Sequence, residues 1–407
     1  MGELSLDGSL QPIKGALPIA IKARELGFEG MIVPQQNAHE AAVVNNLKVY
    51  GAGNIKEVIE FFNGTQELTP TLVNTREEFY SQQSNFDFDF AEVKGQENVK
   101  RALEVAASGS HNILLIGSPG SGKSMLAKRL PSILPPLSLG ESLETTKIHS
   151  VAGKLGKDGG LISKRPFRAP HHTISTVAMT GGGSFPQPGE ISLAHNGILY
   201  LDELPEYSRN VLEVLRQPLE DRKITVSRIR CNVEYPASFM LVASMNPCPC
   251  GYYTHPTKAC VCSPGQVQKY LNRISGPLLD RIDLHIEVPP VDFRDLSNTA
   301  KEESSASIKA RVDAARDIQN KRFANTGITC NAQIPPEMLH EVCRTAPAAD
   351  ALLKNAFEKF GLSARAYDRI LKVARTCADL AGSEDIGKSH IAQAISFRSL
   401  DRKYWNR

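Results

Sequence analysis

The chain has 407 residues, of which 41% are hydrophobic and 22% are charged, and its formal net charge is +3. This length is enough for roughly two or three domains with sizeable cores. The near-neutral balance excludes an overall polycationic surface, so any contact with nucleic acid has to come from local basic patches. No apolar run is long enough to cross a bilayer and the start carries no secretory signal, so we expect a cytoplasmic protein with no membrane partner.

The first 63 residues alternate between strand-like and helix-like segments. GMIVP is typical of a buried strand, and the stretches around it have the periodicity of amphipathic helices. The expected helices are ALPIAIKAREL at 16–26, NAHEAAVV at 37–44 and NIKEVIEFFNG at 54–64. The chain opens on a strand-like segment with nothing before it to pair with, so we expect the first half of this domain to lie outside the chain.

Composition divides the rest of the chain. Residues 64–85 are polar and predict a linker. Residues 86–290 carry short apolar strands between helices and glycine-rich loops, which predicts an α/β core. A second linker is expected at 291–305, and residues 306–407 have strong helical periodicity that is clearest in SARAYDRILKVARTCADLAG at 363–382.

The stretch ILLIGSPGSGKSMLAKRL reads as a strand, a glycine-rich loop and a helix, and Gly117–Ser124 satisfies G-x-x-x-x-G-K-[ST]. The glycines let backbone N–H groups surround phosphate oxygens, and the dipole of the following helix favours the same anions. The lysine reaches the β- and γ-phosphates, and the final hydroxyl suits Mg²⁺. The predicted ATP-binding residues are Gly117, Ser118, Pro119, Gly120, Ser121, Gly122, Lys123 and Ser124.

A second motif supports this prediction. NGILYLDEL is an apolar strand that ends in Asp202 and Glu203. We expect Asp202 to hold Mg²⁺ together with Ser124, and Glu203 to polarise the attacking water. The alternative is an ordinary strand followed by an acidic helix cap.

Asn246 ends another apolar strand, SFMLVASMN. In a parallel sheet this strand end can lie beside Asp202 and face the γ-phosphate, where a neutral amide would orient the attacking water. A phosphate loop, an acidic strand and a polar strand end, in this order, resemble the AAA+ ATPases.

Four cysteines follow at once, in the order C-x-C, nine residues, C-x-C. In a reducing compartment the eight cysteines of the chain are expected to be free or metal-bound. Four thiolates in a short turn-rich loop can enclose a tetrahedral Zn²⁺, and the alternative is four reduced thiols. The candidate zinc ligands are Cys248, Cys250, Cys260 and Cys262, with His255 as a spare.

Three longer motifs make the resemblance closer: RPFRAPHHTIS at 165–175, GGGSFPQPGEISLAHNGILYLDELPEY at 181–207 and MNPCPCGYY at 245–253. Together they resemble the magnesium-chelatase-like AAA+ ATPases of the ComM/YifB group, over nearly the whole chain. The adjacent His171 and His172 suggest a structural or substrate-contacting role rather than a metal site, because no carboxylate is obviously placed near them.

The resemblance implies an AAA+ P-loop core with β-hairpin inserts, a helical C-terminal lid, and a hexameric ring with ATP sites between subunits. Asn246 matches the first sensor position of such ATPases. Arg281 matches the arginine finger that reaches the neighbour's γ-phosphate, and Arg365 matches the second sensor. The alternatives are that Arg281 pairs with Asp280 or Asp283 on the surface and that Arg365 is simply solvated.

The family's two hairpins map onto 181–191 and onto 220–236, where the residues alternate. The second contains Arg222, Lys223, Arg228 and Arg230, which can hold a phosphate backbone in a central channel or form a solvated charged hairpin. The N-terminal segment resembles the second half of the Lon protease fold. Its lysine position is occupied by Ile19 and its serine stretch is absent, so we expect an inactive domain that serves contact with protein partners or assembly.

The leading interpretation is an ATP-driven ring motor acting on DNA, in line with the branch-migration helicase role in natural transformation that the resemblance implies. An alternative is a chelatase-type ATPase chaperone that remodels a protein partner during metal insertion. A third is a regulatory ATPase or a partner of a separate protease.

Overall fold

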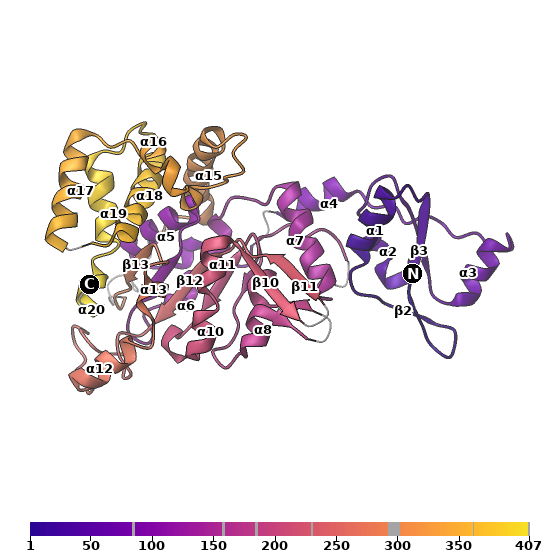
Figure 1. Ribbon diagram of the computed structural model, residues 1–407, viewed down its shortest axis with the longest axis horizontal. Coiled ribbons are helices and arrows are strands. Elements are labelled where there is room, and N and C mark those ends of the chain that lie inside the picture. The colour runs from indigo at the N-terminus through magenta and orange to yellow at the C-terminus, as the bar shows by residue number, and fades with distance from the viewer. Residues whose placement is uncertain are drawn as a thin grey trace.

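The computed structural model describes residues 1–83, 86–156, 159–183, 186–228, 231–291, 302–360 and 362–405, with the backbone alone at positions 228, 231, 360 and 402. Figure 1 shows an N-terminal unit at one end of the long axis, a sheet flanked by helices in the middle, and a cluster of helices at the other end. None of the helices within these ranges combines the length and the apolar character that crossing a membrane requires.

The N-terminal unit is built on two parallel strands. β3 (Gly30–Pro34) pairs with β4 (Lys48–Ala52), and Leu17, Val33 and Val49 are fully buried between the strands and the neighbouring helices. The other elements are β1 (Glu3–Leu4) paired with β2 (Leu10–Gln11), α1 (Ala16–Glu25), α2 (Gln35–Ala42) and α3 (Ile55–Phe62). Each expected helix is present within a few residues, but β4 was not predicted.

A buried carboxylate fixes this unit to the middle of the molecule. Glu40 on α2 accepts hydrogen bonds from the backbone N–H of Leu17, from the side-chain amide of Asn37 and from the hydroxyl of Ser150. Ser150 belongs to α7 (Leu139–Val151), which packs against α1. Burying a charge is costly unless its hydrogen bonds are satisfied, so the contact with Ser150 favours one position of the N-terminal unit against α7.

The predicted linker at 64–85 is not irregular throughout. It contains α4 (Thr75–Gln82), which Asn74 caps by accepting a hydrogen bond from the backbone N–H of Glu77. Phe79 of this helix is buried. The helix was not predicted because the segment is polar: Phe79 is its only buried residue, and one apolar residue produces no helical periodicity.

A five-stranded parallel sheet forms the middle of the molecule, in the order β13-β5-β12-β9-β6. The strands are β5 (Ile113–Ile116), β6 (Phe167–Arg168), β9 (Ile198–Leu201), β12 (Met240–Met245) and β13 (Leu284–Glu287). In the register, Met245 lies opposite Ile116 and Ala243 lies opposite Leu201. The carboxyl ends of β5, β12 and β9 therefore meet at one edge.

Side chains of the sheet alternate between two cores, as the pleat requires. Ile113 and Leu115 enter one core, and Leu114 and Ile116 enter the other. The first core is covered by α5 (Glu97–Gly109), α6 (Lys123–Arg129), α15 (Ser305–Arg322), α18 (Ala364–Leu380) and α19 (Lys388–Ser396). The second is covered by α8 (Thr176–Thr180), α9 (Glu190–Leu193), α10 (Arg209–Glu213), α11 (Arg216–Asp221), α12 (Pro264–Leu271), α13 (Gly276–Leu279) and α20 (Leu400–Trp405).

The C-terminal region is helical, as its periodicity predicts, and the helix expected at 363–382 is α18. Residues 292–301 of the expected second linker lie outside the described residues, and α15 begins at Ser305 after the capping residue Ser304. Within the described residues, the remaining helices are α16 (Leu339–Val342) and α17 (Pro347–Phe360). Short 3₁₀ turns occur in this region and earlier in the chain: η1 (Phe90–Glu92), η2 (Leu130–Ile133), η3 (Leu204–Glu206), η4 (Asn331–Gln333) and η5 (Pro336–Met338).

Among the described residues, two antiparallel pairs besides β1–β2 lie outside the parallel sheet. β10 (Lys223–Arg228) pairs with β11 (Cys231–Pro236) along its full length, and β7 (Gly181–Gly182) pairs with β8 (Gln187–Pro188). Both fall within the segments where hairpins were expected. Residues 184–185 and 229–230, the latter with Arg230, lie outside the described residues, and so does the side chain of Arg228.

Candidate functional site

The predicted phosphate loop lies between β5 and α6 and borders a cavity of about 350 Å³. Gly122 has φ +90°, a backbone conformation that favours glycine, and a Cβ at Gly117 would lie 2.4 Å from the carbonyl oxygen of Val288. The cavity is lined by Pro119, Gly120, Gly122, Lys123, Ser124, Met125, Asp202, Glu203, Met245 and Asn246. The separate motifs of the sequence therefore meet in one place.

The lysine of the loop is held by the loop itself. Lys123 Nζ donates hydrogen bonds to the carbonyl oxygens of Gly117 at 2.8 Å and Ser118 at 2.9 Å. It also donates to Asn246 Oδ1 at 3.2 Å. Burial lowers the pKa of Lys123, and the nearby carboxylates oppose this shift. A buried cation with a neutral amide beside it is suited to receive phosphate oxygens.

Asp202 lies beside the hydroxyl that ends the phosphate loop. Ser124 Oγ donates to Asp202 Oδ2 at 2.8 Å, and the Ser244 hydroxyl donates to the other carboxylate oxygen. Burial opposes ionisation of Asp202, but these hydrogen bonds together outweigh it and hold its pKa below its ordinary value. An ionised carboxylate next to a serine hydroxyl is a donor set that fits Mg²⁺.

Glu203 follows Asp202 with a backbone φ of +53°, which turns its side chain away from the strand. The side chain is 55% exposed, and Oε2 lies 3.7 Å from Nδ1 of His172. The expectation that no carboxylate lies near the two histidines is therefore wrong. The ring centroids of His171 and His172 are 4.1 Å apart, and the two rings are tilted by 35°. The contact between Glu203 and His172 could not be predicted from the sequence, because β6 and β9 become neighbours only in the sheet.

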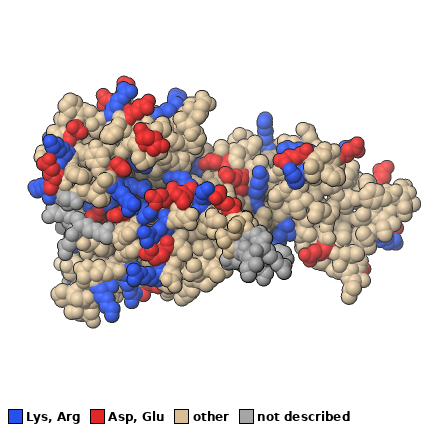
Figure 2. All heavy atoms as spheres, in the orientation of Figure 1, with Lys and Arg blue, Asp and Glu red and all other residues tan. Residues whose placement is uncertain are grey.

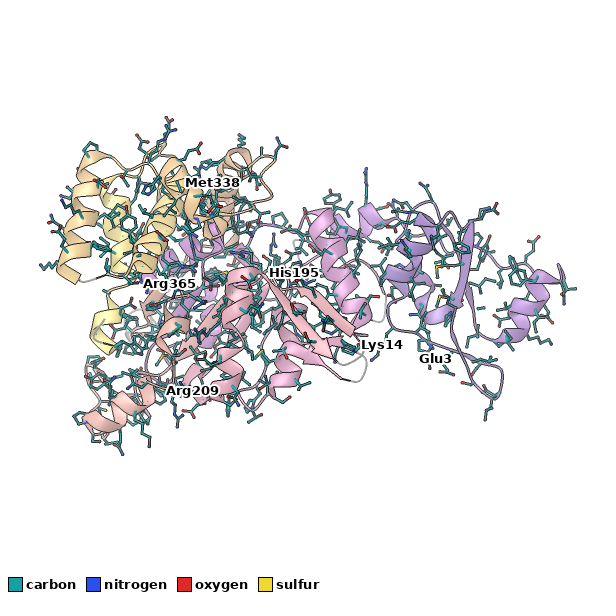
Figure 3. All side chains as sticks on the ribbon, in the orientation of Figure 1. Glu3, Lys14, His195, Arg209, Met338 and Arg365 are labelled. Atoms are coloured by element: carbon teal, nitrogen blue, oxygen red, sulfur yellow. The ribbon has the colours of Figure 1, made fainter. Side chains whose placement is uncertain are left out.

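The two arginines of the site prediction lie elsewhere, in a cavity of about 480 Å³ between the sheet and α18. Figure 3 labels Arg365 near the start of α18, and Figure 2 shows Lys and Arg side chains interleaved with acidic ones along this boundary. Neither Arg281 nor Arg365 borders the phosphate cavity as far as the structure describes it. Within one chain, Lys123 therefore lines one cavity, and Arg281 and Arg365 line another.

Arg281 is nearly buried and pairs with Glu220 of α11. It also donates a hydrogen bond to the carbonyl oxygen of Pro277 at 2.7 Å, while its Nε atom is buried without a partner. The carboxylate of Asp283, one of the partners considered for Arg281, instead binds Arg369 of α18 at 2.9 Å. Arg365 is exposed. Glu220 was not foreseen, because it is far from Arg281 in the sequence.

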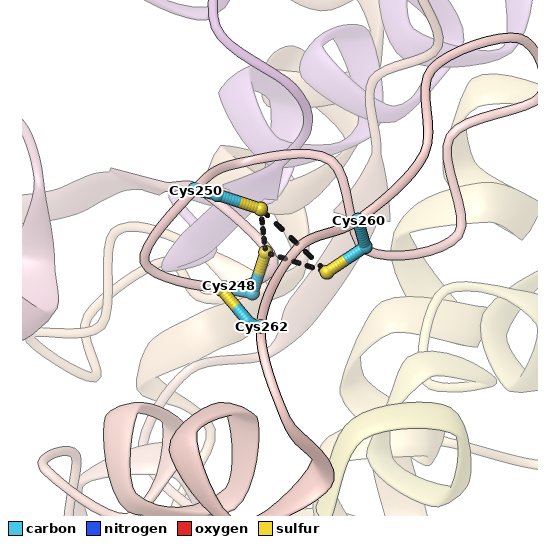
Figure 4. A group of neighbouring side chains, drawn as sticks. All are labelled: Cys248, Cys250, Cys260 and Cys262. Atoms are coloured by element: carbon cyan, nitrogen blue, oxygen red, sulfur yellow. Dashed lines mark hydrogen bonds between the residues drawn. The ribbon is translucent and has the colours of Figure 1, made fainter.

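The four predicted cysteines come together in the loop after Asn246 (Figure 4). Their Sγ atoms all lie within 4.8 Å of one another, and three of the separations are 3.4, 3.6 and 3.7 Å. Zn–S bonds of about 2.3 Å in a tetrahedron place sulfurs about 3.8 Å apart. The cluster therefore has the dimensions of a four-thiolate zinc site. His255 instead accepts hydrogen bonds from backbone N–H groups of its own turn.

The described basic side chains of the second hairpin have local partners. Arg222 donates to the hydroxyl of Ser238 at 3.3 Å, and Lys223 pairs with Glu234 across the strands at 3.0 Å. Both members of that pair are about half exposed. A surface pair of this kind contributes little to stability, so Lys223 can exchange its partner for a phosphate at small cost.

Comparisons with known proteins agree with this arrangement. The family model described as magnesium chelatase, subunit ChlI, matches residues 89–296, its C-terminal counterpart matches 302–398, and a third, subunit ChlI of Mg-chelatase, matches 1–37. The competence protein ComM of Haemophilus influenzae is 42% identical over 404 residues, which cover 99% of this chain and 78% of ComM. YifB of Escherichia coli is 42% identical over 408 residues, covering 99% of this chain and 77% of YifB.

A more distant relative is the magnesium-chelatase 38 kDa subunit of Cereibacter sphaeroides, 24% identical over 330 residues that cover 75% of this chain and 88% of that protein. The two relatives at 42% identity match almost the whole chain, including the N-terminal unit and the cysteine loop. The chain therefore belongs to the ComM/YifB family of magnesium-chelatase-like AAA+ proteins.

Proposed function

We propose that this protein binds and hydrolyses ATP with Mg²⁺ as part of a homo-oligomeric ring, a hexamer, and that the ring moves along DNA as a helicase or branch-migration factor. The observation that carries the proposal is that the predicted nucleotide-binding residues and the predicted arginines line two different cavities. The phosphate loop, Asp202 and Asn246 border one cavity, whereas Arg281 and Arg365 border another. A site that needs both sets is completed only between two copies of the chain.

In this proposal Lys123 and the backbone N–H groups of 117–124 hold the ATP phosphates. The residues present fit the nucleotide, because Lys123 is held at the cavity wall and a Cβ at Gly120 would meet nothing within 4 Å. Ser124 and Asp202 hold Mg²⁺, which neutralises phosphate charge when bound. Their hydrogen bond to each other at 2.8 Å brings both oxygens to one point.

Glu203 is the proposed base that polarises the attacking water, and Asn246 orients that water and the γ-phosphate. The support for Glu203 is its exposed carboxylate at the cavity, and the support for Asn246 is its hydrogen bond to Lys123. Glu203→Gln keeps the size of the side chain but removes its basicity. We expect this variant to bind ATP normally and to turn it over at most about one hundredth as fast.

Arg281 and Arg365 act on the ATP held by the neighbouring subunit. The buried Nε of Arg281 has no partner, and its ion pair with Glu220 can open when a γ-phosphate offers a stronger anion. Lys123→Ala and Arg281→Ala should each abolish turnover, for different reasons. Arg273→Ala, which removes an exposed arginine that pairs with Glu206, is the matched control.

Mixing the two inactive variants tests the site between subunits. In a ring that exchanges its subunits, about a quarter of the interfaces join an intact phosphate loop to an intact arginine finger. Turnover in an equal mixture of Lys123→Ala and Arg281→Ala should therefore rise to about a quarter of the wild-type value. A mixture that stays inactive although light scattering detects rings with ATP and Mg²⁺ would place both residues in one chain's own site and contradict the proposal.

DNA is the proposed substrate of the motor, with the β10–β11 hairpin as its contact. Support comes from Lys223, whose half-exposed ion pair leaves it available to a phosphate backbone. ATPase turnover should rise with forked or single-stranded DNA. Lys223→Ala should make DNA affinity less dependent on salt, whereas Lys56→Ala, which removes an exposed lysine of α3, should not. An unchanged salt slope in Lys223→Ala would remove the hairpin from the proposal.

The second candidate is a chelatase-type chaperone that remodels a protein partner through the N-terminal unit. It is favoured by the similarity to the 38 kDa magnesium-chelatase subunit. Turnover that ignores every DNA substrate but rises with a porphyrin-metallating enzyme would select it.

The four-cysteine loop is proposed to hold a structural Zn²⁺, in keeping with its sulfur separations. Protein purified under reducing, chelator-free conditions should carry about one zinc per chain.

A further inference from the structure

The cysteine loop, residues 247–262, lies against the phosphate loop. Gly251, between the two pairs of cysteines, has φ +83°, and a Cβ built on it would lie 2.4 Å from Cδ of Pro119. The same Cβ would be 3.8 Å from Cγ of Asn246. The turn made by Cys248 and Cys250 therefore packs on the phosphate loop and on the asparagine that faces Lys123.

Regular secondary structure does not hold this loop in place, because residues 247–262 contain neither helix nor strand. Cys248 is fully buried and makes two hydrogen bonds within the loop. Its carbonyl oxygen accepts from the backbone N–H of Gly251 at 3.0 Å, and its sulfur accepts from that of Tyr253 at 3.3 Å. Val261, between the other two cysteines, is 84% exposed. His255 orders its own turn, whereas residues 260–262 are held to the first half of the loop through the sulfur cluster.

The far side of the loop meets the C-terminal helix. The ring of Tyr253 lies 6.4 Å from that of Tyr404, and the hydroxyls of Thr254 and Tyr404 are 3.4 Å apart. The loop is therefore clamped between α20 and the phosphate loop. A change in the shape of the cysteine loop should therefore alter its contacts with the phosphate loop, because α20 occupies the other side.

We infer that metal occupancy of the four-cysteine loop sets the affinity of the protein for ATP, by holding Gly251 and Asn246 against the phosphate loop. This inference rests on the ATP and zinc assignments proposed above. Without the ion, four thiols replace the metal–sulfur bonds that would join the two halves of a loop that lacks secondary structure, and the loop relaxes. Asn246 then loses its fixed place beside Lys123, and Pro119 loses its support.

The size of the effect follows from the contacts. One hydrogen bond to a charged group is worth a factor of about ten or more in affinity. Loss of one backbone N–H aimed at a phosphate should therefore weaken ATP binding about tenfold. The four cysteines do not line the cavity, so a zinc ion held by them would not be expected to touch ATP.

The experiment measures zinc content and the dissociation constant of a fluorescent ATP analogue with Mg²⁺ on the full chain. Zinc is removed with a chelator under reducing conditions, the chelator is dialysed away, and Zn²⁺ alone is added back. The expected result is affinity about tenfold weaker without zinc and fully restored after its return. Circular dichroism before and after separates loop relaxation from global unfolding.

Three variants sharpen the test. Cys260→Ser should lose zinc and weaken ATP binding, whereas Val261→Ser, its exposed neighbour in the same loop, should change neither. Gly251→Ala keeps all four ligands but pushes on Pro119, so it should retain zinc and still bind ATP less tightly. This last variant reports on the contact itself rather than on the metal.

Each outcome decides between the proposals. Equal ATP affinity with and without zinc overturns the inference but leaves both the zinc site and the ATPase standing. A chain that neither contains nor takes up zinc overturns the inference together with the zinc site. A zinc-loaded chain that fails to bind ATP overturns the proposed function first, and this is seen before any chelator is used.

Discussion

Asp283 offers a direct test of how α18, with Arg365 and Arg369, is fixed to the sheet. The side chain is 1% exposed and accepts hydrogen bonds from the backbone N–H of Asn112 at 2.9 Å and from Arg369 at 2.9 Å. His111 Nδ1 lies 3.4 Å from the same carboxylate. Burial opposes ionisation of Asp283, but Arg369 and His111 outweigh it, so its pKa lies below its ordinary value.

Asp283→Asn keeps the shape of the side chain and removes its charge. Removing one partner of a buried ion pair costs about 3–5 kcal/mol, because the other charge is left uncompensated. Arg369 is partly exposed, so water recovers some of that loss. We therefore expect a decrease of about 3 kcal/mol in the free energy of unfolding.

The assay is urea unfolding followed by the fluorescence of Trp405, the single tryptophan of the chain. Its ring lies 6.0 Å from that of His285 on β13, the strand that Asp283 precedes. Asp313→Asn is the matched control, because Asp313 is 39% exposed and pairs with Lys309 along α15. The control should lose less than about 1 kcal/mol. Equal losses in the two variants would refute the assignment of Asp283 as the anchor.

Three further predictions concern stability in acid, the sheet edge and turnover. Burial lowers the pKa of His111 in the folded chain, so the unfolded chain binds a proton at this residue more readily. The free energy of unfolding should therefore fall as the pH drops below about 6.5. His111→Gln should make this dependence on pH shallower. Arg168→Ala breaks a two-point hydrogen bond to Glu190 at 2.6 and 2.7 Å and should cost about 1 kcal/mol in urea unfolding, with Glu190→Gln adding little to the double variant. His172→Ala should leave ATP affinity unchanged but slow turnover by about tenfold or more, because Glu203 loses its neighbour; unchanged turnover would count against that contact.

The phosphate loop and the ends of β9 and β12 could be predicted because each is a continuous local pattern. A strand of four to six apolar residues followed by glycines, carboxylates or an amide carries its own signature in sequence. The parallel arrangement then brings Asp202 and Asn246 together without any further information. The four cysteines were predictable for the same reason, since they occupy one short loop.

Contacts between distant segments could not be predicted. His172 meets Glu203 only because β6 lies beside β9 at the edge of the sheet. Glu220 reaches Arg281 through the packing of α11 on the second core, and periodicity says nothing about which helices become neighbours. Strand β4 was missed because Gly51 interrupts a short apolar run, and glycine is unfavourable in strands.

The strand order explains why the cysteine loop is well placed to influence the cavity beside the phosphate loop. Among the described strands, β12 alone pairs with both β5, which precedes the phosphate loop, and β9, which precedes Asp202. The backbone N–H of Gly117 donates to the carbonyl oxygen of Met245 at 3.1 Å, so the loop begins on the end of β12. The cysteine loop follows β12 directly, so it lies close both to the phosphate loop and to the strand that precedes Asp202. A loop that followed an edge strand such as β6 or β13 would be attached to a strand with only one neighbour in the sheet.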